Sequence, residues 1–449
     1  MIKKVIMGKN SFIVLIIFIS SFSSAFSQEE WTLRECLSYA EENNIALKRI
    51  EVSTERNKAN LLTRKLELLP DLRLQSNGYM NFGRSVDPET NTITFNQNVA
   101  NYYYLNSGIT IFNGFAKLNR INAARFMHLS SQQSEQKERN LLALDIANAY
   151  FSALMAKGTV LSASEQVEVS RSQLHKTQVM VETGAESKTT LLEIQSQLSN
   201  DKLLLSQAKT NAGIALEQLR LLLQLDPGVS FDIAGMDGEI IVRNDESVDT
   251  DSVYSNSKEI LPRIKTLELQ KDAKQRELRA AKGMSLPEVR LFAGWRTGYY
   301  DAMIEGEDPT PFIDQLQNNT NQNVGVSLNI PLFNNWYHRN NIKQAKLDLK
   351  DAKLQLQHEK NALYNEVSSA CFELISVREE YISAYDNLEY NKLSFEAVSK
   401  KFETGLASAT EFAEAKKALF AAEIDLLSAQ LQYRLKEMTV NFYMTGRWE

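Results

Sequence analysis

Residues Phe402–Ser408 read Phe-Glu-Thr-Gly-Leu-Ala-Ser, and 221 positions earlier Val181–Ser187 read Val-Glu-Thr-Gly-Ala-Glu-Ser. The same displacement aligns Phe112 with Phe333. A constant displacement over so long a span indicates two copies of one unit, without insertions between these points. We therefore divide the chain into a first repeat at 28–225 and a second repeat at 251–449, joined by a connector at 226–250.

Long helical patterns flank both glycines. The chain has no proline between Pro88 and Pro227 or after Pro331, as expected of helices in which an interior proline would cost about 3 kcal/mol. The patterns predict long helices at about Phe115–Glu182 and Trp336–Glu403. Some 65 residues at about 1.5 Å each give roughly 100 Å. Each such helix should pack on its return helix as a coiled-coil hairpin, with tips near 184 and 405.

The return helices carry an apolar stripe with alternating spacings of three and four, which is typical of a coiled coil. In the second repeat it comprises Phe412, Ala415, Leu419, Ala422, Leu426, Ala429 and Tyr433. In the first repeat it comprises Leu191, Ile194, Leu198, Asp201, Leu205, Ala208 and Ala212. Only Asp201 interrupts the stripe.

A shorter helix opens each repeat. Thr32 and Glu35 form a capping box, in which a hydroxyl and a carboxylate satisfy free N–H groups at the helix start. This pattern predicts one helix that ends near Pro70. Its counterpart in the second repeat starts near Asp251, passes Pro262 and ends near Pro287.

Four segments alternate between apolar and polar residues, at about 71–84, 102–113, 288–300 and 322–333. Period two over about ten residues predicts strands, either of a membrane barrel or of an ordinary half-buried sheet. A closed membrane barrel needs at least about eight strands, and an open sheet edge in lipid leaves backbone groups unpaired. A membrane barrel would therefore require more than one copy of this chain.

Residues 1–27 have the pattern of a secretory signal peptide, with Lys3, Lys4 and Lys9 before an apolar stretch and a small-residue end. A membrane anchor is the alternative, but the apolar stretch is short for a span. Removing these three lysines changes the net charge from −6 to −9. That charge argues against nucleic acid as a partner.

The residues give little support for catalysis. Cys36 and Cys371 lie far apart in helical patterns and are expected to be buried apolar residues. The four histidines have no ligand partners at metal-binding spacing, and no nucleophile, phosphate-binding or zinc motif is present. We therefore expect no enzyme activity, no cofactor and no metal. The histidines are His128, His175, His338 and His358.

These features together resemble the TolC-like outer-membrane efflux proteins. The resemblance rests on Trp31–Leu37 (Trp-Thr-Leu-Arg-Glu-Cys-Leu), on Leu-Pro pairs at Leu69–Leu72 and Leu286–Val289, on Pro331–Asn334, and on the two Thr-Gly tips. It implies a mainly α chain that forms a homotrimer, with a twelve-stranded barrel in the outer membrane. A tunnel of long helices would continue the barrel through the periplasm of a Gram-negative-type cell.

The resemblance also implies a function and partners. The chain would be the exit duct of a tripartite efflux or type I secretion system, passively exporting substrates. A periplasmic adaptor (membrane-fusion) protein and an inner-membrane transporter would deliver them, and outer-membrane lipid would surround the barrel. The alternative from another class is a secreted coiled-coil structural or spacer protein without a pore. Conductance and trimers in the outer-membrane fraction would distinguish the two.

Candidate gate residues follow from the same resemblance. Similar proteins carry two acids six and nine positions after the second tip glycine, where they ring the periplasmic opening. Those positions here hold Glu411 and Glu414. Being three apart, they share one side of a helix, and a ring of them would favour cations. Solvated glutamates on an exposed face remain the alternative. Ala407 and Thr190 stand where the family has charged residues of a closed-state latch.

The hairpin tips are the candidate contacts for the adaptor, as the resemblance implies. Both glycines are expected to end helices in the left-handed conformation, which glycine adopts at little cost. Plain helix–helix turns are the alternative reading of the same residues. The tip residues are Thr183, Gly184 and Ala185 in the first repeat, and Thr404, Gly405 and Leu406 in the second.

Overall fold

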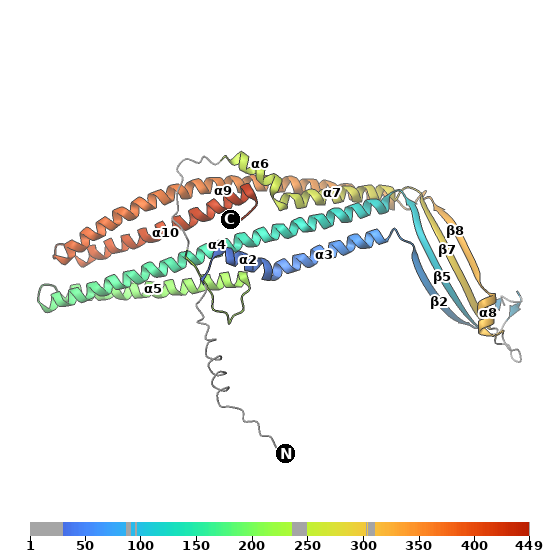
Figure 1. Cartoon of the computed structure of the whole chain (residues 1–449), viewed down its shortest axis with the longest axis horizontal. Helices are drawn as coiled ribbons and strands as arrows, with labels where there is room; N and C mark the ends of the chain where they lie inside the picture. Colours follow the sequence, from blue (N-terminus) through green and yellow to red (C-terminus); the bar gives the residue numbers. More distant parts are fainter. Residues whose placement is uncertain are drawn as a thin grey trace, which may run out of the picture. The chain divides into compact units, whose positions relative to one another are not determined.

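The computed structural model describes residues 30–86, 91–94, 97–235, 249–301, 303 and 310–448. The expected signal peptide at 1–27 lies outside the described residues. The described chain is mainly helical, as predicted (Figure 1). It divides into two compact units, one from the described parts of 1–47, 139–253 and 367–449, the other from those of 48–138 and 254–366. Each unit therefore takes segments from both repeats.

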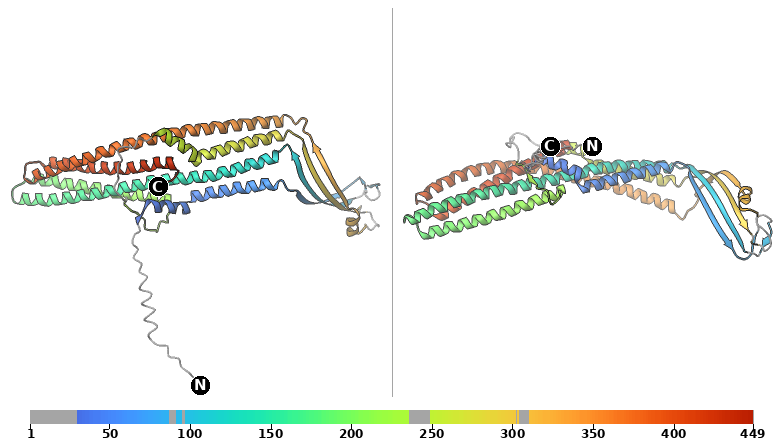
Figure 2. Two further views of the ribbon diagram at one scale, coloured as in Figure 1. Left: turned by 45° about the horizontal axis from the view of Figure 1, so that its top comes forward. Right: turned by 60° about the horizontal axis from the view of Figure 1, so that its bottom comes forward.

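The repeat is visible in the helix bounds. Helices α4 (Ala116–Glu182) and α9 (Tyr337–Glu403) each have 67 residues and are displaced by 221 positions at both ends. Their return helices, α5 (Lys188–Leu223) and α10 (Ala409–Thr445), begin with the same displacement. Figures 1 and 2 show α4 with α5, and α9 with α10, as two helical hairpins.

The apolar stripe predicted on the return helices is the buried side of these helices. Five of its seven positions are buried in α5 and six of seven in α10. The interrupting Asp201 is among the buried residues. A buried carboxylate is costly unless it is paired, so this position requires a partner that the stripe itself does not supply.

The opening helix is broken where one continuous helix was expected. Residues Leu33–Asn43 form α2, with the predicted capping box present, and Ile45–Leu66 form α3. Asn44 between them has extended backbone, with ψ of 123°. Its Oδ1 accepts a hydrogen bond from the N–H of Ala46 at 2.8 Å, and its Nδ2 donates to Leu222 O at 3.1 Å. The Asn44 side chain therefore starts a new helix at the break.

The helix that opens the second repeat is also broken after 11 residues. Thr250–Ile260 form α6 and Pro262–Gly283 form α7, with Leu261 extended between them. Proline disfavours helical backbone in the residue before it and is well suited to the first turn of a helix. The break therefore falls at Pro262, which the sequence analysis expected the helix to pass.

The four predicted strands form one antiparallel sheet in the second unit. Its order is β2 (Asp71–Asn81), β5 (Asn98–Asn113), β7 (Glu288–Asp301) and β8 (Asn321–Asn329), as Figure 1 shows. The pairing of β5 with β7 joins the two repeats. β5 starts earlier than predicted. β2 and β8 end earlier than predicted, and Pro331 has no N–H to extend β8. A separate ribbon pairs β3 (Ser85–Val86) with β4 (Ile93–Thr94).

The register gives the sheet one apolar and one polar face. Leu74, Leu105 and Trp295 are cross-strand neighbours on one face, while the next row brings together Gln75, Tyr104 and Arg296 on the other. Apolar side chains of the first face are open to solvent in the single chain, with Leu74 73% and Val324 79% exposed. Among the described residues, the outer strands β2 and β8 each pair with one strand only. Both edges of the sheet are therefore open.

A short helix that the sequence did not predict, α8 (Phe312–Asn318), covers the end of β7 that β8 does not reach. Gln315 Oε1 accepts from Tyr300 N, and its Nε2 donates to Tyr300 O, both at 2.8 Å. Asn319 Nδ2 donates to Gly298 O at 2.9 Å. Side-chain amides therefore replace a strand partner at this stretch of the edge.

The first unit has its core around α2, α4 and α5. Cys36, Tyr150, Leu219 and Leu223 are among its buried residues. Burial raises the pKa of the Cys36 thiol to about 12, and both cysteines are free and buried. The prediction that they serve as small apolar residues is confirmed.

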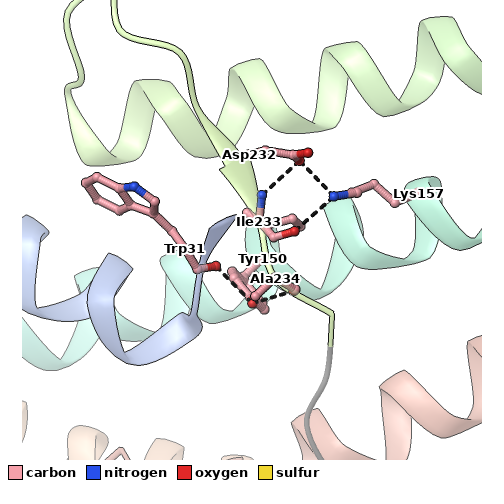
Figure 3. Close-up of polar contacts among 6 residues, drawn as sticks. All are labelled: Trp31, Tyr150, Lys157, Asp232, Ile233 and Ala234. Carbon is pink, nitrogen blue, oxygen red and sulfur yellow. Dashed lines mark hydrogen bonds and ion pairs between the residues drawn. The ribbon is translucent and has the colours of Figure 1, made fainter. Parts of the chain in front are cut away.

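A two-residue parallel strand pair lies against this core. β1 (Glu30–Trp31) pairs with β6 (Asp232–Ile233), which belongs to the connector. As Figure 3 shows, the Tyr150 hydroxyl lies 2.9 Å from Ala234 O and 3.2 Å from Trp31 O. Lys157 Nζ contacts the Asp232 carboxylate at 2.8 Å and Ile233 O at 2.9 Å. Tyr150 and Lys157 of α4 therefore hold β1, at the start of the described chain, and β6, in the connector, against the core of the first unit.

Candidate functional site

Both hairpin tips end their first helix in the same way. In the first, Gly184 has φ of +80°, its N–H bonds to Val181 O at 3.1 Å, and Ala185 N bonds to Met180 O at 2.8 Å. The second repeats this arrangement, with φ of +73° at Gly405 and Leu406 N bonded to Lys401 O at 2.8 Å. This is the Schellman motif, which satisfies the last carbonyls of a helix. The predicted left-handed glycines are confirmed.

The tip side chains are open to solvent. Thr183 and Ala185 are exposed in the first tip, as are Thr404 and Leu406 in the second. Leu406 is 78% exposed. The Thr183 and Thr404 hydroxyls bond back to carbonyls of their own helices. The tips therefore present small or apolar side chains on a fixed backbone turn. Their expected contact with an adaptor stays a prediction.

The second helix of each hairpin is capped by a serine, and here the repeats differ. Ser187 Oγ accepts the N–H of Thr190 at 3.0 Å. Ser408 Oγ accepts the N–H of Glu411 at 3.2 Å, and the Glu411 carboxylate accepts the Ser408 N–H at 2.7 Å. The second tip is therefore a complete capping box. The pattern Ser-x-x-Glu was visible in the sequence, but Glu411 was interpreted only as a gate residue.

Glu411 is thus both a cap and a candidate gate residue. The hydrogen bonds from the Ser408 N–H and hydroxyl lower the pKa of the Glu411 carboxyl, so the charged form is favoured. The side chain is exposed. A negative charge in the first turn also suits the positive end of the helix dipole. The cap holds the carboxylate at a defined place beside the tip.

Glu414, one turn further along α10, is also exposed. It lines a groove of about 750 Å³ in the first unit, together with Gln197, Asp201, Lys416 and Lys417. The two predicted gate acids therefore lie on one helix but in different surroundings. The ring that they would form requires further copies of the chain, so the gate stays a prediction.

An aromatic cluster packs behind the second tip. The Phe412 ring lies 5.2 Å from that of Phe402 and 5.6 Å from that of Phe395, measured between centroids. Ile194 of the first hairpin completes the cluster, and Ala407 packs against it. Ala407, where the resemblance implied a basic latch residue, therefore makes an apolar contact here. Thr190, at the other latch position, shares a hydroxyl contact with Ser187 at 3.0 Å.

An ion pair links the outer ends of the two hairpins. Lys176 Nζ of α4 lies 2.6 Å from Glu403 Oε1 of α9. Both side chains are about half exposed, so the pair contributes at most about 1 kcal/mol. It marks where hairpin 1 (α4 and α5) and hairpin 2 (α9 and α10) come together near their tips.

A second ion pair between the hairpins is fully buried. Lys416 Nζ of α10 lies 2.5 Å from Asp201 Oδ2 of α5, and the side chains are 2% and 5% exposed. The hydroxyl of Ser170, from α4, bonds to the same carboxylate oxygen at 2.5 Å and also contacts Lys416. Gln197 Nε2 donates to Asp201 Oδ1 at 2.9 Å. The interruption in the apolar stripe is therefore a buried, hydrogen-bonded polar cluster.

Burial acts on this cluster in the expected direction. It lowers the pKa of Lys416, while the hydrogen bond and the charge of Asp201 act to raise it. A buried pair of this kind is stable only with both partners in place. Sequence reasoning found Asp201 as the anomaly but not Lys416, because a lysine beside an apolar stripe is usually solvated.

Comparison with known proteins places this architecture. The two long helical hairpins and the four-stranded sheet recur in solved structures of outer-membrane channels. The chain belongs to the outer membrane efflux protein family, whose model matches residues 36–224 and 253–445. The resemblance noted in the sequence is therefore confirmed. A search of curated protein sequences finds no match.

Solved structures of outer-membrane channels share the fold at low sequence identity. The crystal structure of CusC has a TM-score of 0.77 at 15% identity and covers 92% of this chain and 91% of that chain. The CmeC outer membrane channel of Campylobacter jejuni has 0.77 at 17%, covering 93% and 86%. The MtrE outer membrane channel of Neisseria gonorrhoeae, in its open state, has 0.72 at 17%, covering 92% and 88%.

The family is that of outer membrane efflux proteins, and the fold is the one seen in solved outer-membrane channels. Within the described residues, no group of three metal-binding side chains is suitably placed to hold an ion. In the same part of the chain, no helix has the length and apolarity needed to cross a membrane.

Proposed function

We propose that this chain is the outer-membrane exit duct of a tripartite efflux or type I secretion system. The observation that carries the proposal is the sheet. It has two open edges and an apolar face that is exposed in the single chain. In water, the open edges and apolar face of such a sheet promote association with other chains. In lipid, contact between the apolar face and the bilayer would be favourable only if the strand edges were paired.

Closure by further copies follows from the strand number. Three copies of a four-stranded sheet supply twelve strands, enough for a closed barrel with a lumen. The polar face, with Gln75, Tyr104 and Arg296, would line that lumen, and the face with Leu74 and Trp295 would contact lipid. The helical hairpins of the three copies would then form the periplasmic tunnel of a homotrimer.

Export through such a duct is passive, because the chain carries no motif for nucleotide hydrolysis. An inner-membrane transporter would supply the energy and choose the cargo. A periplasmic adaptor protein would join the two, with the exposed tips at Thr183–Ala185 and Thr404–Leu406 as its contact. The Schellman turns support this role, since they hold the tip backbone in a defined shape.

We assign the periplasmic gate to Glu411 and Glu414. Threefold symmetry would gather six carboxylates near the axis, and such a ring attracts cations through electrostatics. The capping box supports the assignment of Glu411, because it holds the carboxylate at a defined place beside the tip. Glu193 is the first-repeat position equivalent to Glu414, and it provides a matched control.

The duct is tested with the purified protein in planar bilayers. Wild type should form heat-modifiable trimers that conduct. Leu74→Arg puts a charge on the apolar face and should cost up to about 2–4 kcal/mol per copy near the bilayer centre, which should reduce trimer yield. Gln75→Arg, on the opposite face of the same strand, is the control and should assemble. Absence of conductance in wild type, with equal behaviour of both variants, would favour the spacer protein instead.

The gate is tested by charge removal without loss of the cap. Glutamine at the third helix position retains a capping box, so Glu411→Gln together with Glu414→Gln removes charge while preserving the tip. This variant should lose cation selectivity and block by divalent cations, whereas Glu193→Gln should retain both. Equal selectivity in all three proteins would refute the gate and leave the duct standing.

A further inference from the structure

The buried cluster of Asp201, Lys416, Ser170 and Gln197 occurs once in the chain and is not repeated by the duplication. It joins hairpin 1 to hairpin 2 within the chain, since Asp201, Ser170 and Gln197 come from hairpin 1 and Lys416 from hairpin 2. Because the repeats are related by a displacement of 221, the chemistry of the equivalent positions can be read directly.

The equivalent positions are neutral. Ser170 corresponds to Asn391, Asp201 to Ala422, and Lys416 to Gln195. Ala422 is 1% exposed within hairpin 2, and the Asn391 side chain donates to Asn387 O of its own helix at 2.8 Å. Gln195 is exposed on hairpin 1 in the single chain. No charge therefore stands at any of the three counterparts.

These counterparts define a second contact. In a closed ring, hairpin 1 and hairpin 2 alternate around the axis. Hairpin 2 of one protein chain therefore contacts hairpin 1 of the next chain, in the same geometry in which hairpin 1 contacts hairpin 2 within a chain. This step rests on the proposed trimer. The duplication then brings Asn391 and Ala422 of one copy to Gln195 of the next. The two kinds of hairpin contact would share a backbone arrangement but differ in charge.

The charge difference has an energetic consequence. Placing Lys416 or Asp201 in the wrong contact would bury a charge without its partner, which is strongly unfavourable. Such penalties against a wrong partner are a source of pairing specificity. We propose that Asp201 and Lys416 are specificity-determining residues that select the hairpin contact within the chain, and that the neutral contact between copies is the one that separates first.

The hairpins of one chain are already joined through Lys416 and Asp201 before any copy is added. Assembly then adds preformed hairpin pairs, and opening of the tube would move hairpins two at a time. The exposed face carrying Gln195 is the surface that receives a second copy.

Cross-linking tests this, with one reporter for each contact. Lys176 and Glu403 already touch within the chain, so Lys176→Cys with Glu403→Cys reports the contact within the chain. The equivalent positions are Ala397 and Glu182, so Ala397→Cys with Glu182→Cys reports the contact between copies. Both are made in the full chain with Cys36→Ala and Cys371→Ala, and treated with a short bismaleimide across a urea series.

In the parent protein, the contact within the chain should survive to higher urea than the contact between copies. Asp201→Ala with Lys416→Gln gives the contact within the chain the same neutral residues as the contact between copies. This variant should remove the difference in urea resistance between the two contacts. The reciprocal change, Ala422→Asp with Gln195→Lys, should move the contact between copies to higher urea. A difference that persists in the neutral variant, or a reciprocal variant that shows no shift, overturns the proposal.

The outcomes separate the proposal from the duct itself. If no trimer forms and nothing conducts, the proposed function fails, while the reporter within the chain still gives its own result on the monomer. If conducting trimers form but the Glu182 and Ala397 reporter gives no product between copies, the assumed equivalence of the contacts is wrong and the proposal falls. Size-exclusion chromatography and conductance on the same preparations decide between these cases.

Discussion

The buried ion pair makes a sharp prediction about stability. Lys416→Met keeps most of the side-chain volume and removes the ammonium group, which leaves the Asp201 carboxylate buried with only Ser170 and Gln197 as partners. Breaking a buried pair on one side costs about 3–5 kcal/mol. The low exposure of both side chains, 2% and 5%, places this pair at the buried end of the range.

Hydrogen exchange of the intact protein measures this cost locally. Since each 1.4 kcal/mol is about a factor of ten, a cost of about 3–5 kcal/mol should lower amide protection in α5 and α10 around the pair by roughly two to three and a half orders of magnitude. Lys417→Met changes the neighbouring, exposed lysine and should alter protection by less than about tenfold. The double change Asp201→Leu with Lys416→Met removes both charges and should restore most of the protection.

Two results of the exchange measurement would contradict this prediction. If Lys416→Met loses no more protection than Lys417→Met, the ammonium does not compensate the buried carboxylate. If the double variant loses as much as the single one, the cost comes from packing of the side chains rather than from an unpaired charge. Either result would also remove the energetic basis for selecting the contact within the chain.

Three further predictions concern the tips and the packing around the core. Because the folded pKa of Glu411 lies below its ordinary value of 4.5, its cap stabilises the second tip above that value and is lost as the pH falls through the folded pKa. Amide protection at this tip, taken relative to the intrinsic exchange rate at each pH, should therefore fall in acid, while the first tip, capped by Ser187 through the Thr190 N–H, changes less. Tyr150→Phe removes the one hydroxyl proton that is shared between Ala234 O and Trp31 O, of which Trp31 O keeps its bond from the Ala234 N–H. It should cost about 1–3 kcal/mol locally, seen as faster proteolysis near Trp31, and no change there would refute the anchor. Gly184→Ala meets open space and should cost only the left-handed backbone, about 1–2 kcal/mol, whereas Gly114→Ala adds a clash with the Gly283 backbone and should lower the unfolding temperature further.

The sequence predicted the regular elements because their signals are redundant. The bounds of α4 and α9 differ from the expected ones by a single residue at the start, since many periodic positions point to the same helix. The four strands were found from alternation alone, with errors of a few residues at their ends. The duplication strengthened both predictions, because each repeat gave separate sequence evidence for the same helix or strand.

The features that were missed depend on residues distant in the sequence. The break at Asn44 is stabilised by a carbonyl of Leu222, which no local pattern reveals. Helix α8 is too short for periodicity to show, and its key contact is made by Gln315 to a strand edge. Lys416 was passed over because its partner lies in the other repeat. In each case a polar side chain satisfies backbone or charge that only the folded chain brings near.

The duplication acquires its functional meaning from the places where the copies differ. Both tips have the same backbone turn, so the difference between Thr190 and Glu411 changes charge without changing shape. The difference between Gln195 and Lys416 does the same for the hairpin contacts. In a ring of six equivalent hairpins, all six hairpin contacts would be equally stable. No carboxylate would then cap every second tip. Asp201, Lys416 and Glu411 have neutral residues at their equivalent positions, and this reduces sixfold geometry to threefold. A duct built from three such chains would therefore have three fixed hairpin pairs, three yielding contacts and one carboxylate-capped tip in each pair.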